Sequence, residues 1–140
     1  MKKIKVLFLV WIVAIAGIFV MNSCEDIPDC ERKHVGMVTV ENKTGWDALT
    51  DVTWGDVIEN YEVWLNPEES YTYFDVPAGT IEIWISFDGV DWTWEDEPLN
   101  PCEHLTYTWL PSSRKSANGC PFVLYLPDGT TVVPERKDKH

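Results

Sequence analysis

The sequence has few basic residues, with 11 Lys and Arg against 23 Asp and Glu and a formal net charge of −12. An acidic surface of this kind repels nucleic acid and anionic lipid headgroups, because both are dense in negative charge. The composition therefore argues against nucleic acid as a partner.

The sequence also lacks the short motifs of common enzymes. It has no serine in a glycine-rich elbow, no His-Glu-x-x-His motif and no phosphate-binding glycine loop. Cys102 and His104 are a candidate nucleophile and base at short spacing, which leaves a small hydrolase as an alternative. We expect no catalytic residues and no cofactor. Because none of the four cysteines forms a Cys-x-x-Cys pair, we also expect no metal site.

One long hydrophobic run stands at the N-terminus. Residues 6–21 read VLFLVWIVAIAGIFVM after a lysine-rich start, and Asn22-Ser23-Cys24 follows. A basic start, an apolar run and a small residue before a cysteine are the order of an export signal with a lipid-attachment site. The segment resembles a bacterial lipoprotein signal peptide, in which Cys24 takes the position of the lipidated cysteine. We expect a signal helix over residues 1–23 and a lipidated tether over residues 24–34.

The acidic pair Glu25 and Asp26 resembles the surface-export signal of lipoproteins of the Bacteroides group. The resemblance implies a cell-envelope protein that its lipid holds on the outer membrane, exposed at the cell surface. Two alternatives remain open, an uncleaved membrane anchor and an ordinary signal cut near Ser23.

The rest of the sequence contains no amphipathic helix. Short alternating runs rich in Val, Ile, Thr, Tyr and Trp are separated by Gly, Pro, Asn and Asp, a pattern typical of strands with short connections. It predicts one all-β domain over residues 35–134, a small antiparallel β-sandwich of immunoglobulin-like or transthyretin-like type, with a flexible tail at 135–140. The expected strands are 35–41, 48–54, 59–65, 70–76, 80–87, 90–95, 103–110, 122–126 and 130–134.

Short turns suggest how these strands pair. Asp88-Gly89 is a strong hairpin signal, because both residues tolerate positive φ, and it sets Ile85 opposite Trp92. A similar turn at Ala78-Gly79 and the loop at 66–69 would extend this hairpin into a meander. A last hairpin at Asp128-Gly129 sets Leu124 opposite Val133.

Three cysteines, Cys30, Cys102 and Cys120, are disulfide candidates once Cys24 carries a lipid, and an oxidising envelope favours one bond and one free thiol. If 103–110 and 122–126 form a hairpin, Cys102 and Cys120 lie at opposite ends, roughly 25 Å apart at about 3.3 Å per residue. A disulfide needs Cα atoms within about 7 Å, which favours a bond from Cys30 to one of the other two.

The meander would give the sheet two different faces, because side chains alternate along a strand. The expected core face holds Tyr61, Val63, Phe74, Val76, Ile81, Ile83, Ile85, Trp92 and Trp94. The other face gathers four rings, Trp64, Tyr71, Tyr73 and Trp84, with the carboxylates of Glu62, Asp75 and Glu82 beside them. Rings that stack on sugars and carboxylates that accept from hydroxyls make this face, with Glu62 and Glu82, a candidate ligand-binding site.

The segments GMVTVENKTGWDALTDVTW (36–54) and YTYFDVPAGTIEIWISFDG (71–89) resemble small β-sandwich lipoproteins of the Bacteroides group. The resemblance implies the fold and the envelope location and no activity. From the aromatic face of Trp64, Tyr71, Tyr73 and Trp84 we expect a non-catalytic binding or accessory module that contacts a glycan. The alternative is a structural or assembly protein whose aromatic face packs on an envelope protein.

Overall fold

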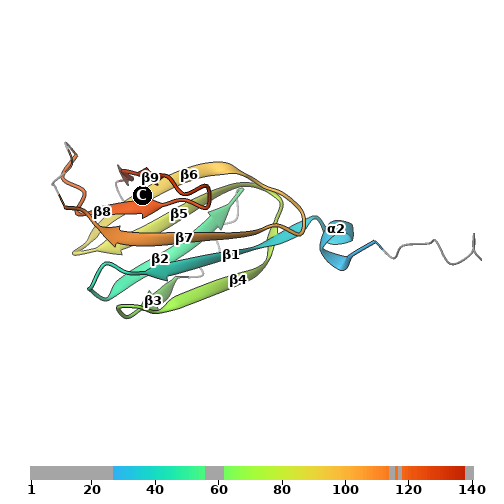
Figure 1. Ribbon diagram of the computed structural model, residues 1–140, viewed down its shortest axis with the longest axis horizontal. Helices are drawn as coiled ribbons and strands as arrows, with labels where there is room; N and C mark the ends of the chain where they lie inside the picture. The colour runs from blue at the N-terminus through green and yellow to red at the C-terminus, as the bar shows by residue number, and fades with distance from the viewer. Residues whose placement is uncertain (1–26, 56–61, 114–115, 117, 138–140) are drawn as a thin grey trace, which may run out of the picture.

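The computed structural model describes residues 27–55, 62–113, 116 and 118–137, and it is an all-β sandwich (Figure 1). Two five-stranded sheets pack face to face, which confirms the fold class that the strand pattern predicts. The first, here called sheet A, has the order β4 (Ser70–Pro77), β1 (Val35–Asn42), β7 (His104–Pro111), β8 (Phe122–Tyr125) and β9 (Thr131–Val132). Sheet B has the order β10 (Glu135–Lys137), β6 (Val90–Leu99), β5 (Gly79–Phe87), β2 (Ala48–Trp54) and β3 (Val63–Leu65).

The hairpin between β5 and β6 has the predicted register. Ile85 pairs with Trp92 and Ile83 with Trp94. Asp88 and Gly89 have φ values of 50° and 76°, as a turn with two left-handed residues requires. This hairpin forms the centre of sheet B.

The predicted meander through Ala78-Gly79 is wrong, because β4 and β5 belong to different sheets. Strand β4 pairs with β1, where Glu41 lies opposite Ser70, and not with the strand before the loop at 66–69. Strand β3 pairs with β2, where Ala48 lies opposite Leu65. Gly79 has positive φ and Ala78 does not, so the two residues do not form the hairpin turn, and the chain crosses from one sheet to the other.

A bulge in β4 reverses part of the predicted core. Val38 pairs with Tyr73 and Gly36 with Val76, so that two residues, Phe74 and Asp75, lie opposite one. Asp75 has a φ of 54°, a left-handed conformation that bulges and turns accommodate. As a result Tyr73 and Val76 are both buried, whereas Phe74, which we expected in the core, is 70% exposed.

The core lies between the sheets, and both sheets contribute to it. Its largest fully buried side chains include Trp109, Tyr107 and Phe122 from sheet A, and Ile81 and Ile83 from sheet B. The core residues expected on β5 and β6 are confirmed for Ile81, Ile83, Ile85 and Trp92. Trp94 of β6 and Val63 of β3 are partly buried against the core. Tyr61 lies outside the described residues.

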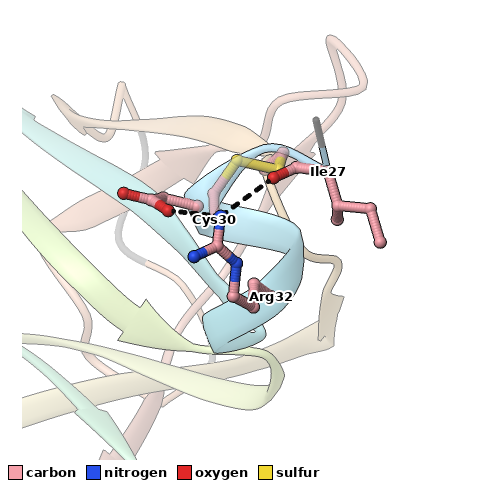
Figure 2. Close-up of a disulfide and its surroundings, with 5 residues drawn as sticks. Ile27, Cys30 and Arg32 are labelled. Atoms are coloured by element: carbon pink, nitrogen blue, oxygen red, sulfur yellow. Dashed lines mark hydrogen bonds and ion pairs between the residues drawn. A yellow bond between two sulfur atoms is a disulfide. The ribbon is translucent and has the colours of Figure 1, made fainter. Parts of the chain in front are cut away.

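A short helix, α2 (Asp29–Lys33), precedes β1 at one end of the sandwich (Figure 1). Cys30 in this helix forms a disulfide with Cys102, just before β7 (Figure 2). The Arg32 guanidinium donates to the carbonyl of Ile27 at 3.3 Å. The predicted bond from Cys30 is thus confirmed. Residues 29–33, part of the segment expected to be a tether, form helix α2, and the disulfide attaches this helix to the sandwich.

The other cysteine of the described chain, Cys120, is buried and takes no part in a disulfide. Its thiol donates to the carbonyl of Phe122 at 3.3 Å. The hairpin of β7 and β8 that separates Cys120 from Cys102 is formed as expected, with Leu124 opposite Trp109.

The C-terminal segment differs from the prediction in two places. Leu124 pairs with Val132 instead of Val133, a shift of one residue. Residues 135–137, expected in a flexible tail, form β10 and pair with β6. The long β6 offers an unpaired edge, and the backbone of β10 satisfies part of it.

Candidate functional site

The four rings of the predicted platform do not share one face. Tyr73 is buried between the sheets with 5% of its surface exposed. Tyr71 lies at the edge of sheet A and contacts Tyr73 edge-on, with 4.9 Å between the ring centroids. Trp64 and Trp84 are both on the outer face of sheet B, since they pair with Leu49 and Asp51 of β2. The platform is therefore not formed, because it required β3, β4 and β5 to be neighbours.

Trp84 is held in place by its neighbours. Its indole N–H donates to Thr53 Oγ1 at 2.9 Å, and Lys137 Nζ lies 4.6 Å from the centre of its ring. The same ammonium lies 2.7 Å from Glu82 Oε1, which also accepts from the Thr93 hydroxyl. The predicted site residues Trp84 and Glu82 thus help to dock β10. Trp64 is 69% exposed, and Glu62 is exposed beside it in the sequence.

Lys137→Ala is expected to lower the free energy of unfolding by about 1 kcal/mol, since it removes a half-exposed ion pair and a cation–π contact. Urea unfolding followed by tryptophan fluorescence measures the change. Lys137→Arg should retain most of the stability, and Lys33→Ala on α2 serves as the matched surface control. Equal stability of the Lys137→Ala and Lys33→Ala variants would contradict a docking role.

Asp51 is an aspartate in an unusual position, on the outer face of sheet B and only 7% exposed. Its Oδ1 accepts a hydrogen bond from the Val52 amide at 2.7 Å. Burial raises the pKa of the Asp51 carboxyl to about 6; the hydrogen bond from Val52 opposes this shift and the negative charge of Glu62 adds to it. The Asp51 carboxyl therefore holds its proton to a higher pH than an ordinary aspartate does.

A groove with a volume of about 550 Å³ runs along the outer face of sheet A. Strand β7 forms the floor of the groove, because the side chains of Thr106 and Thr108 are shorter than those of the lining residues on the neighbouring strands. One wall comes from the end of β1 and the residue after it, and the other from the end of β8 and the turn that follows. The groove is lined by Glu41, Lys43, His104, Thr106, Thr108, Leu110, Tyr125, Leu126 and Pro127.

The register places three of these side chains in one row across the sheet. Glu41 pairs with Thr108, and Thr108 pairs with Tyr125. The flanking pairs Val40–Tyr107 and Trp109–Leu124 are buried, so the row faces outward. Two strand spacings separate Glu41 from Tyr125, a distance of about 10 Å.

Hydrogen bonds organise the polar side of the groove. The Thr108 hydroxyl donates to Glu41 Oε2 at 2.9 Å, and Lys43 Nζ lies 3.9 Å from the same oxygen. At the other end, His104 Nε2 lies 2.8 Å from Thr39 Oγ1, which in turn lies 2.8 Å from Thr72 Oγ1. The carboxylate of Glu41 and the ring of His104 are thus held at defined positions before any ligand arrives.

Sequence reasoning missed this groove, because its floor and one wall come from strands far apart in the chain. Strand β7 lies parallel to β1, with Met37 opposite His104. Two parallel strands are not joined by a short turn, so the sequence contains no local signal for this pairing. The alternating threonines of 106–108 were the available signal, since a polar alternation marks an outward face.

The structure removes one catalytic candidate. Cys102 is bonded to Cys30, and a disulfide sulfur is not a thiolate nucleophile. Within the described ranges no group of three or more His, Cys, Asp and Glu residues gathers to hold a metal ion. The described part of the chain also contains no helix long and apolar enough to cross a membrane; the expected signal segment and Cys24 lie outside it.

A scan against models of known protein families finds no match, and a search of curated proteins finds none either.

Proposed function

We propose that this protein is a cell-envelope lipoprotein, anchored through Cys24, that binds a ligand in the groove of sheet A without transforming it. The groove carries the proposal. It combines an apolar wall with oriented hydroxyl, carboxylate, ammonium and imidazole groups in a volume of about 550 Å³, which is within the range of small-ligand sites.

The disulfide would fix which end of the sandwich lies next to the membrane. Six residues from Cys24 to Cys30 span at most about 20 Å, so a lipid on Cys24 would keep the α2 end of the sandwich next to the membrane. Strand β7 begins two residues after Cys102 and runs away from that end (Figure 1). The groove would then extend outward from the membrane and remain open to solvent along its length.

The anchor is tested by the intact mass of the protein isolated from its native membrane. We expect the mass of residues 24–140 plus acyl chains, and we expect Cys24→Ala to abolish the acylated species. The mass of the full, unmodified chain would instead indicate an uncleaved anchor, and it would contradict the lipoprotein assignment.

The binding role is tested by amide NMR spectra of the ¹⁵N-labelled mature protein in detergent, recorded with separate pools of neutral oligosaccharides, acidic oligosaccharides and short peptides. Binding in the groove should shift the amides of β7 and of residues 125–127 and leave those of β5 unchanged. If no pool shifts the β7 amides, the groove is not a binding site for these ligands and the proposed function fails.

A second function has an observation in its favour. Trp64 and Phe74 are 69% and 70% exposed, on the outer face of sheet B and on the bulge of β4. Aromatic side chains are enriched at the contact surfaces between proteins. A structural or assembly protein that packs through them remains the alternative, and Trp64→Ala in the envelope-bound protein would then weaken the assembly.

A further inference from the structure

We propose that the groove of sheet A binds a neutral oligosaccharide of about three pyranose units, with one ring stacked on Tyr125 and its hydroxyls bound between Glu41 and Lys43. This inference rests on the proposed function and specifies its ligand class. It moves the sugar contact from the predicted four-ring platform, which is not formed, to the groove on the outer face of sheet A.

The shape of the groove suits a chain of flat rings. Six residues of β7 separate His104 from Leu110, a length of about 20 Å. The backbones that carry the two walls, at Glu41 and Tyr125, are two strand spacings or about 10 Å apart, with the short Thr108 side chain between them, and a single pyranose ring fits across this row. The floor of threonines leaves room because their side chains are short.

The apolar wall provides the stacking surface. Tyr125 is 42% exposed, and Leu110, Leu126 and Pro127 line the groove with it. One face of a pyranose ring presents mainly C–H groups, which pack on an aromatic ring. An aromatic side chain of this kind offers a large contact area that loses little conformational entropy on binding.

The polar wall matches a pair of adjacent hydroxyls. Glu41 Oε2 accepts and Lys43 Nζ donates, and the two atoms are 3.9 Å apart. This distance is too long for a strong hydrogen bond, so both atoms keep the capacity to bind a ligand. Two neighbouring hydroxyls of a sugar can satisfy both, one as donor to Glu41 and one as acceptor from Lys43. The Thr108 hydroxyl fixes the carboxylate in this position.

The charges of the groove and of the whole chain favour a neutral ligand over an anionic one. The groove has one carboxylate and one ammonium beside each other, and the chain as a whole carries a net charge of −12. An acidic saccharide would meet both the local carboxylate and the general negative potential. A neutral saccharide is repelled by neither the carboxylate nor the negative potential.

The test is a calorimetric and NMR titration of the mature protein in detergent with maltotriose, cellotriose and mannotriose, and with trigalacturonate as the anionic comparison. We expect at least one neutral trisaccharide to bind and to shift the β7 amides, and trigalacturonate not to bind. Tyr125→Ala should weaken binding about 10-fold, equivalent to about 1.4 kcal/mol, and Tyr125→Phe should retain it.

Two further variants separate this site from the predicted platform. Thr106→Val replaces a hydroxyl with a methyl group of similar size and should weaken binding a few-fold while unfolding is unchanged. Trp64→Ala, on sheet B, should leave the affinity unchanged. Saccharide binding that depends on Trp64 and not on Tyr125 would overturn the assignment. Peptides that shift the β7 amides when no saccharide does would overturn the ligand class and leave the proposed function standing.

Discussion

The double substitution Cys30→Ala and Cys102→Ala is expected to lower the free energy of unfolding by about 4 kcal/mol. The disulfide closes a loop with a sequence separation of 72 residues, and the entropy that such a loop removes from the unfolded chain corresponds to about 4 kcal/mol at 25 °C. For a domain of this size, a loss of about 4 kcal/mol lowers the melting temperature by roughly 20 °C. Urea unfolding of residues 24–140 carrying Cys24→Ser provides the measurement.

Reduction supplies the matched control for this prediction. Dithiothreitol should move the unfolding midpoint of the disulfide-bonded protein to that of the double variant, and it should not affect the variant itself. Cys120 is present in both proteins, so its thiol does not contribute to the difference. A double variant as stable as the bonded protein would show that packing of α2, without the covalent bond, holds this end of the sandwich.

Asp51→Asn is expected to stabilise the protein by about 2 kcal/mol at pH 8 and to have almost no effect at pH 4. The pKa of the Asp51 carboxyl rises from 3.8 to about 6 in the folded protein because the group is buried. The fold therefore favours the neutral form. The stability that this preference provides is fully present below pH 3.8 and is lost as the pH rises through about 6.

Asparagine tests this explanation because it has the same shape and no charge. Its side-chain oxygen can still accept the hydrogen bond from the Val52 amide that Asp51 accepts now. Unfolding by urea at several pH values should show the two proteins converging between pH 6 and pH 4. Asp47→Asn, at an exposed position, should change stability little at any pH. A destabilising Asp51→Asn at pH 8 would mean that the carboxylate has a partner that stabilises its charge.

The hairpin of β5 and β6 could be predicted from the sequence because the residues that determine its turn and its register are close together in the chain. Asp88-Gly89 specifies the turn, and the alternation of Ile83 and Ile85 against Trp92 specifies which face is buried. The same reasoning predicted the bounds of β2 without error. A strand with a short, well-defined turn leaves few alternative registers.

The sheet to which β4 belongs could not be predicted in this way. Two local features of the backbone override what the alternation of its apolar and polar residues indicates. Ala78 does not adopt the positive φ that the hairpin needs, and the bulge at Phe74 and Asp75 changes which side chains face the core. The predicted platform failed for this reason. Its four rings alternate correctly along their own strands, but the strands lie in two sheets.

The parallel pair of β1 and β7 has a consequence for how the chain folds. Strand β1 lies between β4 and β7, and its partner β7 follows it in the sequence by more than sixty residues. A polypeptide that is synthesised from its N-terminus exposes β1 long before β7 emerges. High contact order of this kind slows folding and leaves a hydrophobic strand edge unprotected meanwhile. Before β7 emerges, such a chain faces its greatest risk of aggregation, whereas the hairpin of β5 and β6 in sheet B pairs locally and can form early.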